Sequence, residues 1–220
     1  MDASTLLDDL NRRLGFIGRF YLKAVGPFEA TQRKIVREKE AFLSRGDDAP
    51  DSFIEEDWNE STKCVQVLGQ CCLGLSEKAL HDYLRKFVER EGGVEKKSGN
   101  WFNWYSDFLT QNTPFEWARS PVTYNQIEQI NLSRNDCSHD PDIDSKQPAQ
   151  SQKHFKKHPR SRFSDELERA ILTAMDGREP DFPISLRVTK QGLFNALGDV
   201  QRFCEFVETQ KMSKPRASTR

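Results

Sequence analysis

The sequence has no apolar segment long enough to cross a membrane and no excess of charge of either sign. No stretch approaches the roughly 20 consecutive apolar residues that a transmembrane helix needs, so we expect no membrane partner. The chain carries 33 Lys and Arg against 34 Asp and Glu, for a formal net charge of -1. This balance gives no bulk-charge indication of nucleic-acid binding, although it leaves room for a local basic patch.

Cysteine motifs are also missing. The 5 cysteines include no Cys-x-x-Cys pair, which argues against a structural zinc site, and we expect no bound metal or other cofactor. Their odd number, with an N-terminal segment that has none of the apolar core of a signal peptide, predicts reduced thiols and a cytoplasmic protein. Cys64, Cys71 and Cys72 stand among aliphatic residues and are expected to be small buried residues.

The apolar residues that are present recur mostly at steps of three and four. Hydrophobic residues make up 36% of the chain, charged residues 30% and aromatic residues 10%, with a mean hydropathy of -0.76. Such a polar chain must place much of its length on exposed helix faces or in loops. The spacing predicts an all-α fold, an antiparallel helical bundle of about seven or eight helices with a long polar loop.

Glycine and proline set the expected helix boundaries. Gly26-Pro27 is expected to separate a first helix from one over residues 28–45, and Gly74 to separate residues 53–73 from a helix that Ser76 caps. Further helices are predicted over residues 100–109, 121–139, 164–175 and 190–210, with a short strand or extended segment at 184–189. The aromatic stripe of the 100–109 helix is typical of a core face, with a base-stacking surface as the alternative; it comprises Trp101, Trp104, Tyr105 and Phe108.

The stretch INLSRNDCSHDPDID, residues 130–144, concentrates side chains that carry chemistry. An EF-hand calcium loop is excluded, because Ser145 and Ser151 occupy the positions that need glycine and glutamate. A looser magnesium or zinc site that uses His139 and an aspartate remains an alternative. Arg134 and His139 are five residues apart, which leaves them about 140° apart on a continuous helix. They can converge if the helix ends between them, or across the axis of a dimer.

The run RNDCSH, with Asn135 directly after Arg134 and His139 four residues after Asn135, resembles the signature of the HEPN superfamily, an arginine followed by four to six residues and a histidine. The resemblance implies a HEPN-like all-α fold. It also implies a metal-independent endoribonuclease that works as a homodimer on RNA, as a toxin or defence effector with an antitoxin partner protein. Arg134 and His139 would then be catalytic, with Asn135 supporting them. Other members have lost catalysis, so the alternative is an inactive helical dimer that binds a protein or nucleotide.

The residue types suit RNA cleavage without a metal. Histidine can exchange the 2′-hydroxyl and 5′-oxygen protons near neutral pH, and a guanidinium can bind the charge that develops on phosphorus. A purely structural interpretation also stands: Arg134 pairs with a carboxylate on a neighbouring helix, and His139 caps the end of its own helix. Alanine at His139 would then change only stability.

The chain therefore divides into a bundle over residues 1–139 that ends in the Arg-x4-His motif, a polar and basic flexible loop at 140–162, helices at 163–210 that complete the bundle, and a disordered tail at 211–220. The loop contains a basic cluster that is either solvated or in contact with an RNA backbone. Its candidate RNA contacts are Lys153, Lys156, Lys157 and Arg160.

Overall fold

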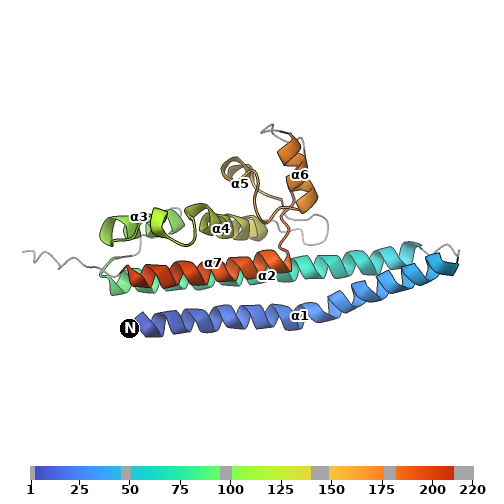
Figure 1. Cartoon of the computed structure of the whole chain (residues 1–220), viewed down its shortest axis with the longest axis horizontal. Coiled ribbons are helices and arrows are strands. Elements are labelled where there is room, and N and C mark those ends of the chain that lie inside the picture. The colour runs from blue at the N-terminus through green and yellow to red at the C-terminus, as the bar shows by residue number, and fades with distance from the viewer. Residues whose placement is uncertain (1–2, 46–50, 95–100, 140–148, 176–181, 211–220) are drawn as a thin grey trace, which may run out of the picture.

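The computed structural model describes residues 3–45, 51–94, 101–139, 149–175 and 182–210, and these stretches are built mainly of helices (Figure 1). The helices are α1 (Ala3–Arg45), α2 (Asp51–Arg90), α3 (Trp101–Asn112), α4 (Tyr124–His139), α5 (Gln152–Lys157), α6 (Glu166–Ala174) and α7 (Lys190–Thr209), with a 3-10 turn at Trp117–Arg119. In the same stretches, β-pairing is confined to two isolated bridges, Ala149 with Ser185 and Ser164 with Leu186. The predicted all-α bundle is confirmed.

A long antiparallel hairpin of α1 and α2 forms the base of the bundle. α7 packs against both of these helices, α4 packs against α2 and α7, and α3 packs against α2. Figure 1 shows α3 and α4 as a further layer above α7, with α5 and α6 beyond them. The core lies between the hairpin, α7 and α4, and its largest fully buried side chains include Tyr21, Phe87, Phe102, Tyr105, Phe115 and Phe203.

The two expected helix breaks in the hairpin are wrong. α1 runs through Pro27, and α2 runs through Gly74. Proline removes one backbone hydrogen bond from a helix interior, and glycine weakens a helix by about 1 kcal/mol. Packing along both helices outweighs these local costs, because long helices gain most of their stability from a buried apolar face. Ser76 caps nothing, and its hydroxyl donates to the Leu73 carbonyl inside α2 instead.

The ends of the later helices follow the sequence more closely. α4 begins with a capping box, in which the Gln126 backbone N–H donates to Thr123 Oγ1 and the Thr123 N–H donates to Gln126 Oε1. Asp165 caps α6 by accepting from the Leu167 N–H. Thr189 caps α7, whose apolar stripe is buried at Leu193, Leu197, Val200, Cys204 and Val207.

The segment expected to be a flexible polar loop contains a helix. Residues 140–148 and 211–220 lie outside the described residues, but residues 152–157 form α5, which packs on α4. Ser151 caps it by accepting from the His154 N–H. His154, His158 and Ser161 are buried. The lysines of this segment favoured a flexible loop that is solvated or in contact with RNA, whereas His154 and His158 are buried in the protein.

Two further expectations concern the cysteines and the membrane. All five cysteines are free; Cys72 is buried as expected, whereas Cys64 is only half-buried and Cys71 is exposed, which corrects the prediction for these two residues. Burial raises the pKa of the Cys137 thiol to about 12. None of the helices in the described ranges combines the length and hydropathy needed to span a bilayer.

Gly69 of α2 lies against Val188 in the extended segment before α7, so a substitution at Gly69 tests how closely this segment packs on α2. A Cβ at Gly69 would lie 2.8 Å from the Val188 carbonyl oxygen, whereas a Cβ at Gly198 in α7 would meet only the end of the Arg202 side chain at 3.4 Å. We expect Gly69→Ala to lower the free energy of unfolding by about 1–3 kcal/mol. Gly198→Ala is the matched control and should raise it by up to about 1 kcal/mol. Urea unfolding followed by circular dichroism measures both, and equal effects would contradict the close approach.

Candidate functional site

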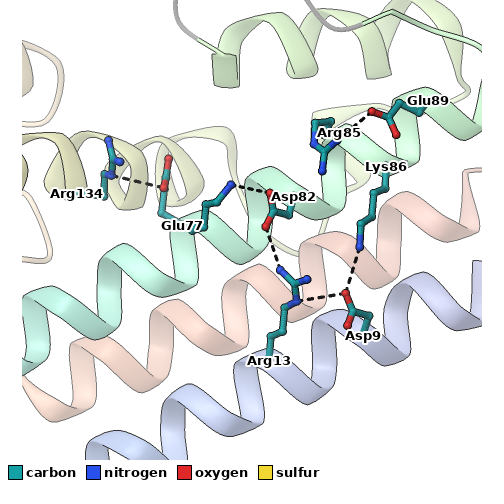
Figure 2. A network of polar contacts seen from close by, with 9 residues as sticks. Asp9, Arg13, Glu77, Asp82, Arg85, Lys86, Glu89 and Arg134 are labelled. Carbon is teal, nitrogen blue, oxygen red and sulfur yellow. Dashed lines mark hydrogen bonds and ion pairs between the residues drawn. The ribbon is translucent and has the colours of Figure 1, made fainter.

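Arg134 lies on the exposed side of α4, and its guanidinium forms an ion pair with Glu77 of α2. Its Nε lies 3.7 Å from Glu77 Oε2, and its side chain is 44% exposed while that of Glu77 is 6% exposed (Figure 2). Its Nη1 donates to Asn135 Oδ1 over 3.0 Å. The structure thus brings Arg134 and Asn135 together at one exposed point. It also confirms the structural interpretation that Arg134 pairs with a carboxylate of a neighbouring helix.

Glu77 is the buried member of this pair and was missed by the sequence analysis. Burial raises the pKa of its carboxyl above the usual value, and the Arg134 charge and a hydrogen bond from Trp101 offset only part of that rise. Trp101 in turn packs edge-on against His81, one turn after Glu77, with ring centroids 4.7 Å apart. Arg134 is therefore anchored to a carboxylate that α2 and α3 jointly enclose.

The backbone of α4 is helical as far as His139. No break separates Arg134 from His139, so within one chain these two positions stay about 140° apart around the helix axis. Convergence through a helix end between them does not occur. The side chain of His139 and the aspartates of DPDID lie outside the described residues, as does the metal alternative that depends on them. Within the described part of the chain, no three His, Cys, Asp or Glu side chains are grouped to hold a metal ion.

A second polar cluster joins α4 to α5. The Nδ1–H of His154 donates to Asp136 Oδ2 over 2.6 Å, and the Nε2–H of His158 donates to Glu128 Oε2 over 2.9 Å. We assign the ring protons this way because a carboxylate can only accept. Lys157 pairs with the other oxygen of Glu128. Two histidine–carboxylate pairs thus fix α5 against the helix that carries Arg134.

Glu128 is the most heavily partnered member of this cluster. Burial alone raises its pKa, but hydrogen bonds from Lys157, His158 and Tyr124 outweigh that effect, so the pKa lies below the usual value. The folded state therefore favours the charged carboxylate. Glu128 and Asp136 are eight residues apart on α4, and His158, directly after α5, follows His154 by four residues, so helical spacing was the signal that would have revealed the cluster.

The remaining predicted residues divide between surface and core. Of the candidate RNA contacts, Lys153, Lys156 and Arg160 are exposed, while Lys157 is partly occupied by its ion pair with Glu128. The aromatic stripe of α3 behaves as core: Tyr105 is buried, and three half-buried side chains, Trp101, Trp104 and Phe108, pack on it. The packing of this stripe supports its interpretation as a core face over that as a base-stacking surface.

The Glu128 cluster gives a pH-dependent prediction. A depressed carboxyl pKa contributes stability above the unfolded pKa of about 4.3, and that stability is lost as the pH falls through the folded value. We expect Glu128→Gln to lower the free energy of unfolding by about 2 kcal/mol at pH 7. The difference from wild type should shrink steadily below about pH 4.5. Urea unfolding across this range measures it, with exposed Glu60→Gln as the control; a difference that does not change with pH would contradict the assignment.

Comparisons with known proteins return no relative of this chain. No family model matches the sequence, and searches of curated proteins and of solved structures find no match either.

Proposed function

We propose that the chain is a metal-independent endoribonuclease whose site lies at the C-terminal half of α4. The observation that carries the proposal is the placement of Arg134: a surface guanidinium whose Nε faces the buried Glu77 and whose Nη1 is held by Asn135. A guanidinium that is fixed before substrate arrives stabilises the charge of a phosphorane without reorganising. The 44% exposure of its side chain leaves it accessible to a phosphodiester.

The reaction follows from the residue types. A histidine base removes the proton from the ribose 2′-hydroxyl, and the 2′-oxygen forms a bond to phosphorus. The bond from phosphorus to the 5′-oxygen then breaks, and a histidine acid protonates that oxygen. The products are a 2′,3′-cyclic phosphate and a free 5′-hydroxyl. Arg134 binds the non-bridging oxygens, which carry the developing charge.

This reaction needs a base and an acid, and each chain contributes one His139. Since α4 is unbroken between Arg134 and His139, a two-fold pairing of α4 segments is the arrangement that supplies two histidines beside two arginines. We therefore propose a homodimer with a composite site. An antitoxin partner protein would act by covering this site, and Lys153, Lys156 and Arg160 would extend the contact with the RNA backbone beyond it.

The direct test is cleavage of a mixed RNA pool in the presence of EDTA. We expect wild type to cleave, His139→Ala to lose about 10²–10⁴-fold in rate, and Arg134→Ala to lose about 10²–10³-fold. Arg33→Ala removes an exposed arginine of α1 and serves as the matched control, with unchanged cleavage. Circular dichroism checks that each variant is folded. If neither wild type nor any variant cleaves RNA, the enzyme proposal fails and the inactive binding module takes its place.

The composite site has a consequence for mixed dimers. If both copies of His139 serve one reaction, a dimer with one His139→Ala subunit is inactive. Co-expression of wild type and His139→Ala in equal amounts should then leave about a quarter of the wild-type activity, because only that fraction of dimers carries two intact chains. Activity that falls to half instead would show that each chain cleaves RNA by itself.

A further inference from the structure

We infer that the exposed face of α1 around Phe16 and Phe20 is a binding surface for single-stranded nucleic acid. The inference does not depend on the cleavage proposal, because this surface belongs to α1, whereas Arg134 and Asn135 belong to α4, which lies beyond α2 and α7 from α1 in Figure 1. Phe16 and Phe20 have 58% and 41% of their surface exposed. Their rings stack nearly parallel, with centroids 6.1 Å apart and planes 13° apart.

This pair faces away from the core. Residues four apart on a helix lie about 40° apart around its axis, so Phe16 and Phe20 form one ridge. The buried residues of this part of α1, which are Leu10, Leu14, Ile17 and Tyr21, lie about 100° or more from Phe16. Two large apolar side chains thus stand on the solvent side of a helix whose other side already fills the core. Among the described residues, the only ring that contacts Phe16 or Phe20 is the other member of the pair.

The contacts between α1 and α2 extend the ridge. Arg13 pairs with Asp82 at 3.0 Å, and Lys86 pairs with Asp9 at 3.4 Å (Figure 2). These pairs set an antiparallel register in which Phe20 lies level with Leu75 of α2. Leu75 is 45% exposed and lies on the face of α2 that carries Asp82 and Lys86. The apolar surface therefore spans both helices beyond the end of the ion-pair ladder.

The charge beside the ridge is positive. From Leu10 to Phe28 the chain has four basic residues and no acidic one. Arg12 and Arg13 pair with Asp9, but Arg19 and Lys23 form no ion pair with a described residue. Both lie within about 60° of Phe16 around the helix axis. Arg19 Nη1 reaches back to 3.2 Å from the position of a Cβ at Gly15, so its guanidinium lies over the residue that precedes Phe16.

Exposed aromatic rings beside positive charge indicate which kind of molecule binds this surface. Exposed aromatic rings that stack on bases, flanked by cations that contact phosphates, are the general means of binding single strands without sequence preference. A second copy of the chain would bring Arg19 and Lys23 towards their own equivalents across a two-fold axis, which like charges disfavour. An acidic protein would satisfy the cations but gives no role to the near-parallel rings. Charge and ring geometry together therefore favour a nucleic acid strand.

The test is fluorescence anisotropy of labelled (dT)20 with the full chain. This probe has no 2′-hydroxyl and cannot be cleaved by 2′-oxygen attack, so the outcome is separate from that of the ribonuclease test. We expect wild type to bind, and the double variant Phe16→Ala, Phe20→Ala to bind at least about tenfold more weakly. The control is Leu22→Ala, which removes a side chain of 45% exposure from a different face of α1 and should bind like wild type.

The cations are tested by salt dependence. The double variant Arg19→Ala, Lys23→Ala should reduce the slope of log K against log salt concentration by about 0.7 for each phosphate that is no longer neutralised. Absence of binding by wild type, or equal binding by the phenylalanine variant, would overturn the inference. Light scattering that shows a wild-type dimer and a monomeric phenylalanine variant would assign the surface to self-association. Equally tight binding of polyglutamate, abolished in the same variant, would assign it to an acidic protein.

Discussion

The apolar contact between α1 and α2 is the interaction on which the rest of the molecule depends. Helices of 43 and 40 residues cannot be stable through backbone hydrogen bonds alone, and here each buries a stripe against the other and against α7. The register of this contact fixes where every side chain of α2 projects. Glu77 follows Leu73 by one turn, so the packing that buries Leu73 also places a carboxylate beneath Arg134. The position of Arg134 in the candidate site therefore depends on how α2 packs in the hairpin, and not only on α4 itself.

At three places in the bundle, a buried carboxylate on one segment forms an ion pair with a basic side chain of another segment. The carboxylate of Glu208 in α7 accepts two hydrogen bonds from Arg90 of α2, from Nη1 at 3.0 Å and from Nη2 at 2.9 Å. Asp199 of α7 pairs with Arg162, and Glu128 of α4 pairs with Lys157 and His158. Pairs of this kind add little net stability, because desolvation opposes their attraction, but a misplaced partner leaves a buried charge unpaired. They therefore select the correct register of α7 and α5 on a core that aliphatic packing alone would leave less specific.

The sequence allowed the helical class and most of the later helices to be predicted, because those helices combine a regular apolar stripe with a capping residue. It misplaced the hairpin because Pro27 and Gly74 act locally, whereas the packing that overrides them comes from residues distant in the chain. α5 was missed because its lysines dominate a six-residue helix and its histidines show their role only against Glu128 and Asp136. Within the site, Arg134 and Asn135 were found from their motif. Glu77 could not be predicted as part of the site, because it lies 57 residues before Arg134 in the chain and becomes its partner only when the protein folds.

The free energy of local unfolding can differ between the two ends of one helix, and the packing of α1 gives a reason for such a difference. Among the side chains that the structure describes, Ile35 is the only hydrophobic residue buried between Val25 and Cys72. Figure 1 shows that α7 covers one half of the hairpin and leaves the other half as two helices without a third. The free energy needed to open backbone hydrogen bonds should therefore fall steeply past Pro27. We expect the part of the hairpin that α7 does not cover to open and close as a cooperative unit, while the covered part, with α4 and its arginine, remains folded.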